Sequence, residues 1–286
     1  MNLYMRISIT LVEINITVKI RYVIPYGVKS QPKLSPLLLS LRLCIHLEGF
    51  QLKKNKINDF LKFRSDRERF INLGGEISHR YPVWSDYRKQ AGSSGGDYFH
   101  QDLLVASFIH ENRPQKHIDV GSRIDGFIAH VAAFRKISVL DIRPLSPLGH
   151  PNIEFIQADL MKADNRLPRA DSVSCLHAIE HFGLGRYGDP IDPLGHQKGF
   201  SNLVSMLDDS GTLYISFPIG RQNEVHFNAH RVFHPQDILS WQASKGLYLV
   251  RFDYVDDAGH LHQNIDLSSK EIAVNLGCGI YTFKKL

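Results

Sequence analysis

The chain has 286 residues, of which 43% are hydrophobic, so it can form one large domain, or a domain with an appendage, around a sizeable core. Its charge is uneven, because residues 1–65 hold 11 Lys/Arg and 3 Asp/Glu (net +8), whereas the remainder holds 23 and 26 (net −3). Three widely spaced cysteines, Cys44, Cys175 and Cys278, fit neither a disulfide framework nor a zinc ribbon, which predicts a reducing compartment. No segment reaches the roughly 20 apolar residues that a membrane-spanning helix needs.

Residues 1–90 are interpreted as a basic lead-in that is partly helical. Apolar and polar residues alternate over 7–11 and 14–20, which is typical of half-buried strands and not of a secretory signal. Residues 53–69 are highly charged and predict a helix. The most apolar stretch, 34–47, is interrupted by a proline, an arginine and a histidine. It fits either a helix packed on a core or an amphipathic helix at a membrane surface.

The positive charge of this lead-in has two interpretations. A basic arm can contact anionic lipid or nucleic acid, whereas a solvated basic segment has no partner at all. We expect no nucleic-acid partner, and at most a weak peripheral association of residues 1–65 with an anionic membrane. The expected location is therefore the cytoplasm, including the inner face of the membrane.

A glycine- and serine-rich break at residues 91–96 precedes a region, 91–286, in which predicted strands and helices alternate. Alternation of this kind predicts an α/β domain. Strands are predicted over 116–120, 137–141, 153–157, 172–176, 212–217, 247–254 and 279–283. Helices are predicted over 98–106, 127–134, 200–207 and 235–244.

Acidic residues end the first three predicted strands of this domain. Asp119 and Gly121 close the first strand, Asp141 ends the second, and Asp159 follows the third. Ligands of doubly wound sheets bind at the carboxyl ends of the strands, where the strand order reverses. A carboxylate after the second strand can accept both ribose hydroxyls, and one after the third suits an adenine amino group, so the acids predict an adenosine ligand. The alternative is that each Asp only hydrogen-bonds its own turn.

Together with these acids, the strand pattern resembles the Rossmann-like class I methyltransferases, which use S-adenosylmethionine. The run 176–181, Leu-His-Ala-Ile-Glu-His, resembles that family's fourth motif, in which a Glu-His pair opens the helix beside the active site. The resemblance implies a doubly wound, mostly parallel sheet with a final antiparallel strand. Over roughly residues 90–286 the chain is more specifically similar to the poorly characterised domain of unknown function 268 family. The similar runs are 98–103, 121–127, 141–145, 180–190, 227–233 and 277–283.

The resemblance implies that S-adenosylmethionine binds in the turns that follow the strands. The implied cofactor-binding residues are Asp119, Gly121, Ser122, Arg123, Asp141, Ile142, Asp159, Leu160 and His177. One position departs from the family pattern, because Arg123 stands where a second glycine usually lets the backbone lie close to the ligand. Its side chain either narrows the methionine end of the pocket or turns away from it.

Three residues after the fourth predicted strand are the candidate catalytic group, namely His177, Glu180 and His181. A neutral histidine can take a proton from a hydroxyl, and a glutamate can fix the histidine tautomer. We therefore expect His181 to act as a base. The alternative is a capped helix start around a buried structural histidine.

The glycine-rich loop 182–190 is a candidate lid or substrate clamp, with Arg186 and Tyr187 as substrate-binding residues. Simple turn structure would also account for its glycines, but less readily for Arg186.

Three further candidates follow the fifth predicted strand, namely His226, His230 and Arg231. We expect them to face the same cleft and to bind an anion or the substrate. The four-residue spacing of the two histidines also permits a metal site with the histidines of the catalytic group. No cysteine joins them, and we expect no metal.

The leading hypothesis is methyl transfer from S-adenosylmethionine to a small or glycan-linked acceptor, in surface polysaccharide synthesis. A second hypothesis is a non-catalytic protein of the same fold, which binds a nucleotide or glycan intermediate or scaffolds a synthesis complex, and which Arg123 favours. A third is a metal-assisted enzyme that uses the histidines. A cofactor-binding experiment separates the first two.

Overall fold

A computed structural model describes residues 4–11, 14–21, 55–83, 85–146, 149–162, 167–268 and 272–286. The chain divides into two compact units, Met1–Gly92 and Ser93–Leu286. The apolar stretch considered above, residues 34–47, lies outside the described residues.

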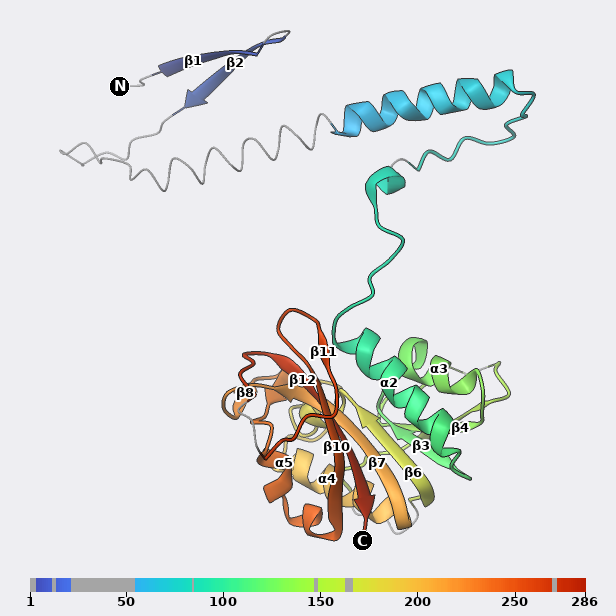
Figure 1. Cartoon of the computed structure of the whole chain (residues 1–286), viewed down its shortest axis with the longest axis vertical. Coiled ribbons are helices and arrows are strands. Elements are labelled where there is room, and N and C mark those ends of the chain that lie inside the picture. Colours follow the sequence, from blue (N-terminus) through green and yellow to red (C-terminus); the bar gives the residue numbers. More distant parts are fainter. Residues whose placement is uncertain are drawn as a thin grey trace, which may run out of the picture. The chain divides into compact units, whose positions relative to one another are not determined.

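The first unit contains a hairpin and a helix (Figure 1). Strands β1 (Tyr4–Leu11) and β2 (Ile14–Arg21) pair antiparallel, which confirms the two strands predicted from alternation. A helix covers residues 55–72 and confirms the charged helix. It carries exposed ion pairs at i,i+4 spacing, such as Lys62–Asp66 at 2.6 Å, which solvent screens strongly. No helix within the described ranges is long and apolar enough to cross a membrane.

The second unit is built on an eight-stranded sheet in the order β11-β10-β12-β7-β6-β3-β4-β5. Strands β3 to β7 pair parallel, which confirms the α/β class and the doubly wound arrangement. Their bounds are β3 His117–Val120, β4 Ile137–Asp141, β5 Ile153–Gln157, β6 Ala170–Leu176 and β7 Leu207–Ile219. The order reverses at β3, which pairs with β4 on one side and with β6 on the other.

At the edge beyond β7 the strands pair antiparallel, as the resemblance implied. Strand β12 (Gly277–Lys285) lies between β7 and β10 (Leu247–Val255) and pairs antiparallel with both. The short strand β11 (Leu261–His262) extends this edge.

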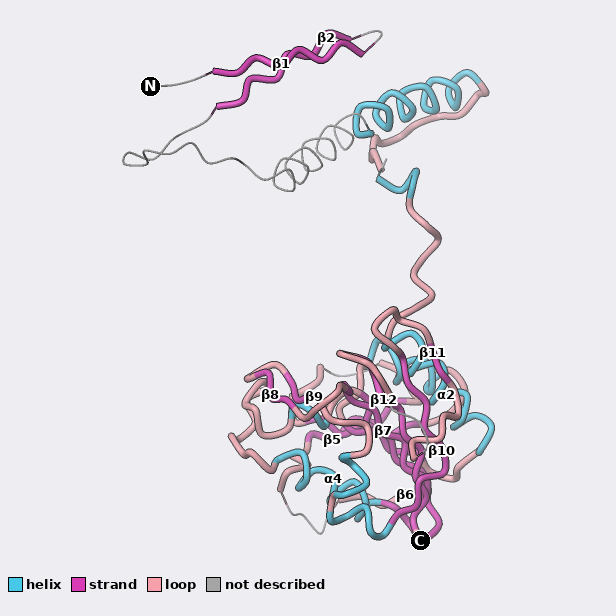
Figure 2. Tube along the Cα trace, turned by 60° about the vertical axis from the view of Figure 1, so that its left-hand side comes forward, coloured by secondary structure: helices cyan, strands magenta, loops and turns pink. Residues whose placement is uncertain are grey.

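Helices cover both faces of the sheet, so two apolar clusters form, one on each face (Figure 2). One cluster includes α2 (Asp97–Asn112) and α3 (Ala129–Ala132), which bury Val105, Ile109 and Val131. The other includes α4 (Gly195–Met206) and α5 (Asp237–Ser240), which bury Phe200, Leu203 and Ile238. Strand β4 is buried at its first four positions, as expected of a strand covered on both faces.

Two predicted helices are interrupted. The helix expected over 127–134 begins instead as a π-helical turn, η2 (Ile124–Ile128), before α3. Gly126 inside that turn has non-helical dihedrals, and a Cβ there would lie 2.6 Å from the Asp102 carboxylate. The helix expected over 235–244 is α5 followed by a 3-10 turn, η4 (Gln242–Gly246), because Trp241 between them is extended.

Candidate active site

A cavity lies at the carboxyl ends of β3, β4 and β6, where the strand order reverses, as the doubly wound fold predicts. Its empty volume, part of which is open to solvent, is about 530 Å³. The predicted site residues that line it are Gly121, Asp141, Ile142, Asp159, Leu160, His177, His181 and Tyr187. The predicted site residues that do not line it are Asp119, Ser122, Arg123, Glu180, Arg186, His226, His230 and Arg231.

Asp119 lies beneath the cavity and holds the turn above it. Its fully buried carboxylate accepts hydrogen bonds from the Ser122 amide at 3.0 Å and from the Ser122 and Ser174 hydroxyls at 2.6 Å each. Burial raises its pKa to about 7, against the lowering effect of these hydrogen bonds. These bonds indicate that Asp119 organises the turn after β3 and does not face the ligand.

The turn after β3 brings its backbone close to the neighbouring strand. Gly121 has φ +76°, and a Cβ there would lie 2.8 Å from that of Ala178, so only glycine fits. The Ser122 hydroxyl accepts the Leu176 amide at 3.1 Å, which ties the β3 turn to the end of β6. These two contacts fix the floor of the cavity.

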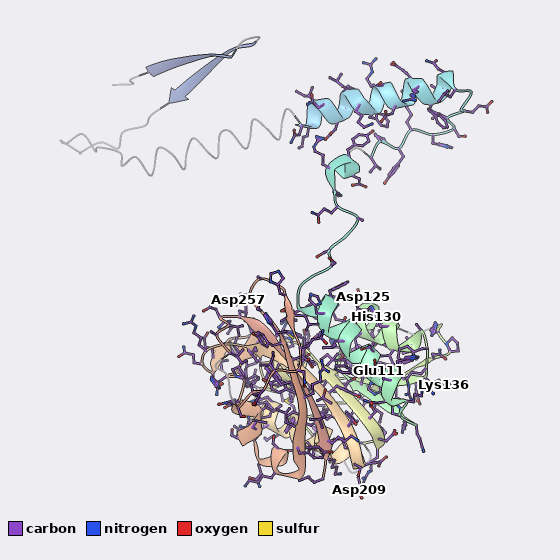
Figure 3. All side chains as sticks on the ribbon, viewed as in Figure 1. Glu111, Asp125, His130, Lys136, Asp209 and Asp257 are labelled. Carbon is purple, nitrogen blue, oxygen red and sulfur yellow. The ribbon has the colours of Figure 1, made fainter. Side chains whose placement is uncertain are left out.

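Arg123 turns away from the cavity, which is the second of the two alternatives for this residue. Its guanidinium pairs with Asp125 at 3.1 Å and lies 5.1 Å from the Tyr98 ring centroid. Asp125 lies at the outer surface of the unit (Figure 3). Arg123 therefore does not narrow the pocket, and its prediction as a cofactor ligand finds no contact in support.

Asp141 lines the cavity but already has a partner. Arg143 donates to it from its amide, Nε and Nη2, at 2.8, 2.9 and 2.5 Å. The Arg143 guanidinium also lies 4.4 Å from the Tyr187 ring centroid. The carboxylate predicted to bind a ribose is thus engaged by an arginine that the sequence analysis left without a role.

Asp159, unlike Asp141, is not paired with an arginine. Its Oδ1 accepts a hydrogen bond from the Met161 amide at 3.0 Å, and its buried Oδ2 has no hydrogen-bond partner among the residues that the structure describes. Lys162 comes no closer to this Oδ2 than 3.5 Å, as an ion pair. A buried carboxylate oxygen without a donor is costly, so this atom suits a ligand that brings an N–H.

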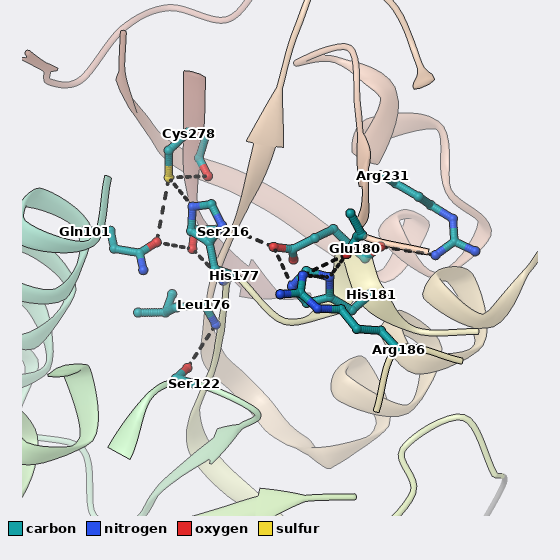
Figure 4. Close-up of polar contacts among 12 residues, drawn as sticks. Gln101, Ser122, Leu176, His177, Glu180, His181, Arg186, Ser216, Arg231 and Cys278 are labelled. Atoms are coloured by element: carbon teal, nitrogen blue, oxygen red, sulfur yellow. Dashed lines mark hydrogen bonds and ion pairs between the residues drawn. The ribbon is translucent and has the colours of Figure 1, made fainter. Parts of the chain in front are cut away.

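Figure 4 shows a chain of polar contacts that runs from Cys278 through His177 to Glu180. His177 is 3.1 Å from Glu180 Oε1 through Nδ1 and 3.2 Å from Cys278 Sγ through Nε2. Burial opposes a charge on His177, but Cys278 and Glu180 raise its pKa well above the usual value. Burial also raises the pKa of Cys278, against the lowering effect of the neighbouring His177. With both ring nitrogens engaged, His177 has none free to act as a base, which argues against a direct catalytic role.

His181 has the free nitrogen that His177 lacks. Its Nδ1 lies 2.7 Å from the Ala229 carbonyl oxygen, which can only accept, and 3.3 Å from Arg186 Nη1, which can only donate; the shorter contact favours a proton on Nδ1. Its Nε2 lies 3.5 Å from Glu180 Oε1. Burial lowers the pKa of His181, which keeps the ring neutral and Nε2 basic near neutral pH. Glu180 Oε2 is buried without a hydrogen bond.

The loop after His181 is held rigidly. The Asp189 carboxylate accepts the amides of Gly183, Gly185 and Tyr187 at 2.8 to 3.2 Å. The glycines adopt φ +78° and +72°, which their lack of a side chain permits. These bonds set Tyr187 on the cavity wall, 5.5 Å from the His181 ring. The arrangement fits a fixed clamp better than a mobile lid.

Arg231 corrects an expectation. It is buried, and its guanidinium donates to the carbonyls of Glu180, Phe182, Asp192 and Pro193 at 2.6 to 3.5 Å. These hydrogen bonds hold the clamp loop (residues 182–190) in place, and they leave few donors of Arg231 free to bind a substrate.

His226 and His230 come together, but as cross-strand partners and not on one helical face. They lie on β8 (Glu224–His226) and β9 (His230–Val232), with ring centroids 4.9 Å apart. His226 is exposed and pairs with Glu224 at 2.7 Å, whereas His230 Nε2 is buried without a partner. Within the described parts of the chain, no three His, Cys, Asp or Glu side chains gather as a metal site would require.

Sequence reasoning missed three contributors to the site. Arg143 stood in the quoted run 141–145, directly after the ribose-type acid, and that position was its signal. Cys278 likewise stood in a quoted run. The Ala229 carbonyl, which also accepts Arg186 Nη1 at 2.9 Å, gave no signal because a backbone acceptor has no residue type.

Residues 154–276 match a family described as "Caenorhabditis protein of unknown function, DUF268". The resemblance to this family is thereby confirmed over that segment, which includes the loop 182–190 and the candidate catalytic histidines. A comparison with curated proteins gave no match.

Among solved structures, the chain is similar to several proteins of the same fold. An S-adenosylmethionine-dependent methyltransferase of Clostridium acetobutylicum is 12% identical, with a TM-score of 0.44 over 66% of this chain and 92% of that one. CalS10, an amino pentose methyltransferase of Micromonospora echinaspora, is 13% identical, with a TM-score of 0.44 over 74% and 100%. The [4+2]-cyclase SpnF is 13% identical, with a TM-score of 0.47 over 74% and 90%. Identities this low carry no statement about activity.

Proposed function

We propose that the protein is an S-adenosylmethionine-dependent methyltransferase that acts on a small or glycan-linked acceptor. The observation that carries the proposal is the cavity wall, where Asp141 and Asp159 follow neighbouring parallel strands. The buried Asp159 Oδ2 without a donor suits an adenine amino group. Gly121 lines the cavity with its backbone alone. The residues present therefore fit the group that the fold family implies.

The cofactor would supply an activated methyl group, and the residues of the chain would position the two reactants. Asp141 would accept hydrogen bonds from the ribose hydroxyls, and Asp159 would accept one from the adenine amino group. His181 would take the proton that the acceptor oxygen or nitrogen loses as it attacks the methyl carbon. Glu180, 3.5 Å from His181 Nε2, would stabilise the resulting imidazolium.

The acceptor class and a role in surface polysaccharide synthesis rest on the family resemblance. Attachment of residues 1–65 to an anionic membrane surface would keep such an enzyme near membrane-bound glycan intermediates. Methyl transfer from labelled cofactor to glycan extracts, by wild type and not by His181→Ala, tests this part. Transfer only to acceptors without a sugar would contradict it.

A second candidate is a binding protein of the same fold without methyl transfer. Arg123 no longer favours it, because its side chain turns outward, but the Asp141–Arg143 pair does. Calorimetry with S-adenosylmethionine discriminates, since a non-catalytic protein for another ligand would give no heat at millimolar cofactor.

A further inference from the structure

The carboxylate at the end of β4 is fully engaged by one side chain. Arg143 Nε donates to Asp141 Oδ1 at 2.9 Å and Nη2 donates to Oδ2 at 2.5 Å. This two-point contact is the strong, planar form of an arginine–carboxylate pair. The Asp141 side chain is only 12% exposed, and Asp141 and Arg143 both line the cavity.

Arg143 itself is free to leave. Its side chain is 46% exposed, and its other contact is with the face of Tyr187, 4.4 Å away on the clamp loop. A long side chain with an exposed end can move into water and keep its own charge solvated, while the Asp141 carboxylate loses its donor. The carboxylate it uncovers would then require a new donor.

A ribose diol needs the same two oxygens that Arg143 now occupies. A carboxylate has about four acceptor positions, and the two that face the guanidinium are filled in the plane of the pair. We propose that Arg143 determines the affinity of this site, because it occupies the ribose-binding oxygens of Asp141 and must be displaced before a nucleoside binds. This inference rests on the proposed function and adds to it a residue that opposes cofactor binding.

The test compares variants by calorimetry, with S-adenosylhomocysteine as the probe. Arg143→Met keeps most of the aliphatic stem over Tyr187 but removes the guanidinium, and should bind roughly fivefold more tightly than wild type. Arg169→Ala is the matched control, since Arg169 forms an exposed pair with Asp208 at 3.0 Å at the opposite ends of the strands. Its affinity should equal that of wild type.

A second pair of probes isolates the ribose contact. Arg143→Met should tighten the binding of adenosine but not that of 2′,3′-dideoxyadenosine, which has no hydroxyls to compete for Asp141. Equal or weaker binding of S-adenosylhomocysteine by Arg143→Met would overturn the inference and leave the proposed function standing. No binding by wild type or by Arg143→Met would overturn the proposed function itself.

Discussion

His181 is the side chain on which the proposed chemistry depends. Its position was predictable, because a Glu-His pair follows an apolar strand in the sequence. The sequence did not predict that His181, and not His177, has a ring nitrogen available to act as a base, because both histidines follow the same strand. The difference comes from tertiary contacts with Cys278 and Ala229, which lie 101 and 48 residues away in the sequence.

Replacement of His181 by alanine should lower kcat by about 100-fold or more while cofactor affinity stays within a few-fold, because a base acts on the acceptor. Since burial lowers the pKa of His181, the basic form persists below pH 6.5, and wild-type activity should fall only as the pH drops further. Steady-state kinetics over pH check both statements. His260→Ala, in an exposed turn, is the control, and an unchanged kcat in His181→Ala would contradict the assignment.

The raised pKa of Asp119 predicts that the free energy of unfolding depends on pH. Its pKa is raised from 3.8 to about 7 by burial, so the folded state holds a proton that the unfolded state releases above about pH 4. Stability from this group is therefore present at low pH and is lost as the pH rises towards 7, by up to about 4 kcal/mol. Asp119→Asn removes this dependence. The difference in unfolding free energy between variant and wild type should grow from pH 4 to pH 7, and a constant difference would count against it.

Among the elements, the clamp loop (residues 182–190) connects His181 to Tyr187 on the cavity wall. Its glycines and Asp189 predicted a turn, and the structure adds the reason for its rigidity. Asp189 holds it from within through backbone amides, and Arg231 holds it from behind through carbonyls. The sequence could not reveal the second contact, since Arg231 lies on β9, whose three residues are too short to show a strand period.

Arg231→Ala should destabilise the fold by about 2–4 kcal/mol, because it leaves several buried carbonyls without a donor. Arg231→Lys should lose less, since an ammonium can satisfy some of them. Chemical denaturation measures both. A variant as stable as wild type, with only a raised KM for the acceptor, would restore the earlier substrate-binding role.

At the scale of the whole molecule, the sheet was the most predictable part. All five parallel strands were predicted near their observed positions, because buried strands are short apolar runs closed by turns. The helices were less predictable, since close contacts such as that of Gly126 with Asp102 interrupt them. The hairpin of β8 and β9 was not predicted as paired strands at all.

The charge of the N-terminal segment predicts a behaviour of the whole chain. The net charge of +8 over residues 1–65 should give weak attachment to anionic vesicles that salt abolishes, since exposed charges are screened over about 8 Å at physiological ionic strength. Flotation of the full chain and of a form lacking these residues measures it. Equal binding by both forms, or binding by neither, would make the segment a structural lead-in only.

The central claim is tested most directly by titrating the protein with S-adenosylmethionine in a calorimeter, with Asp141→Ala beside wild type. The account predicts saturable heat for wild type, and for the variant a loss of about 1.5–3 kcal/mol in binding free energy from the missing ribose hydrogen bonds. No heat and no thermal shift for wild type at millimolar cofactor would contradict the account and leave the non-catalytic candidate.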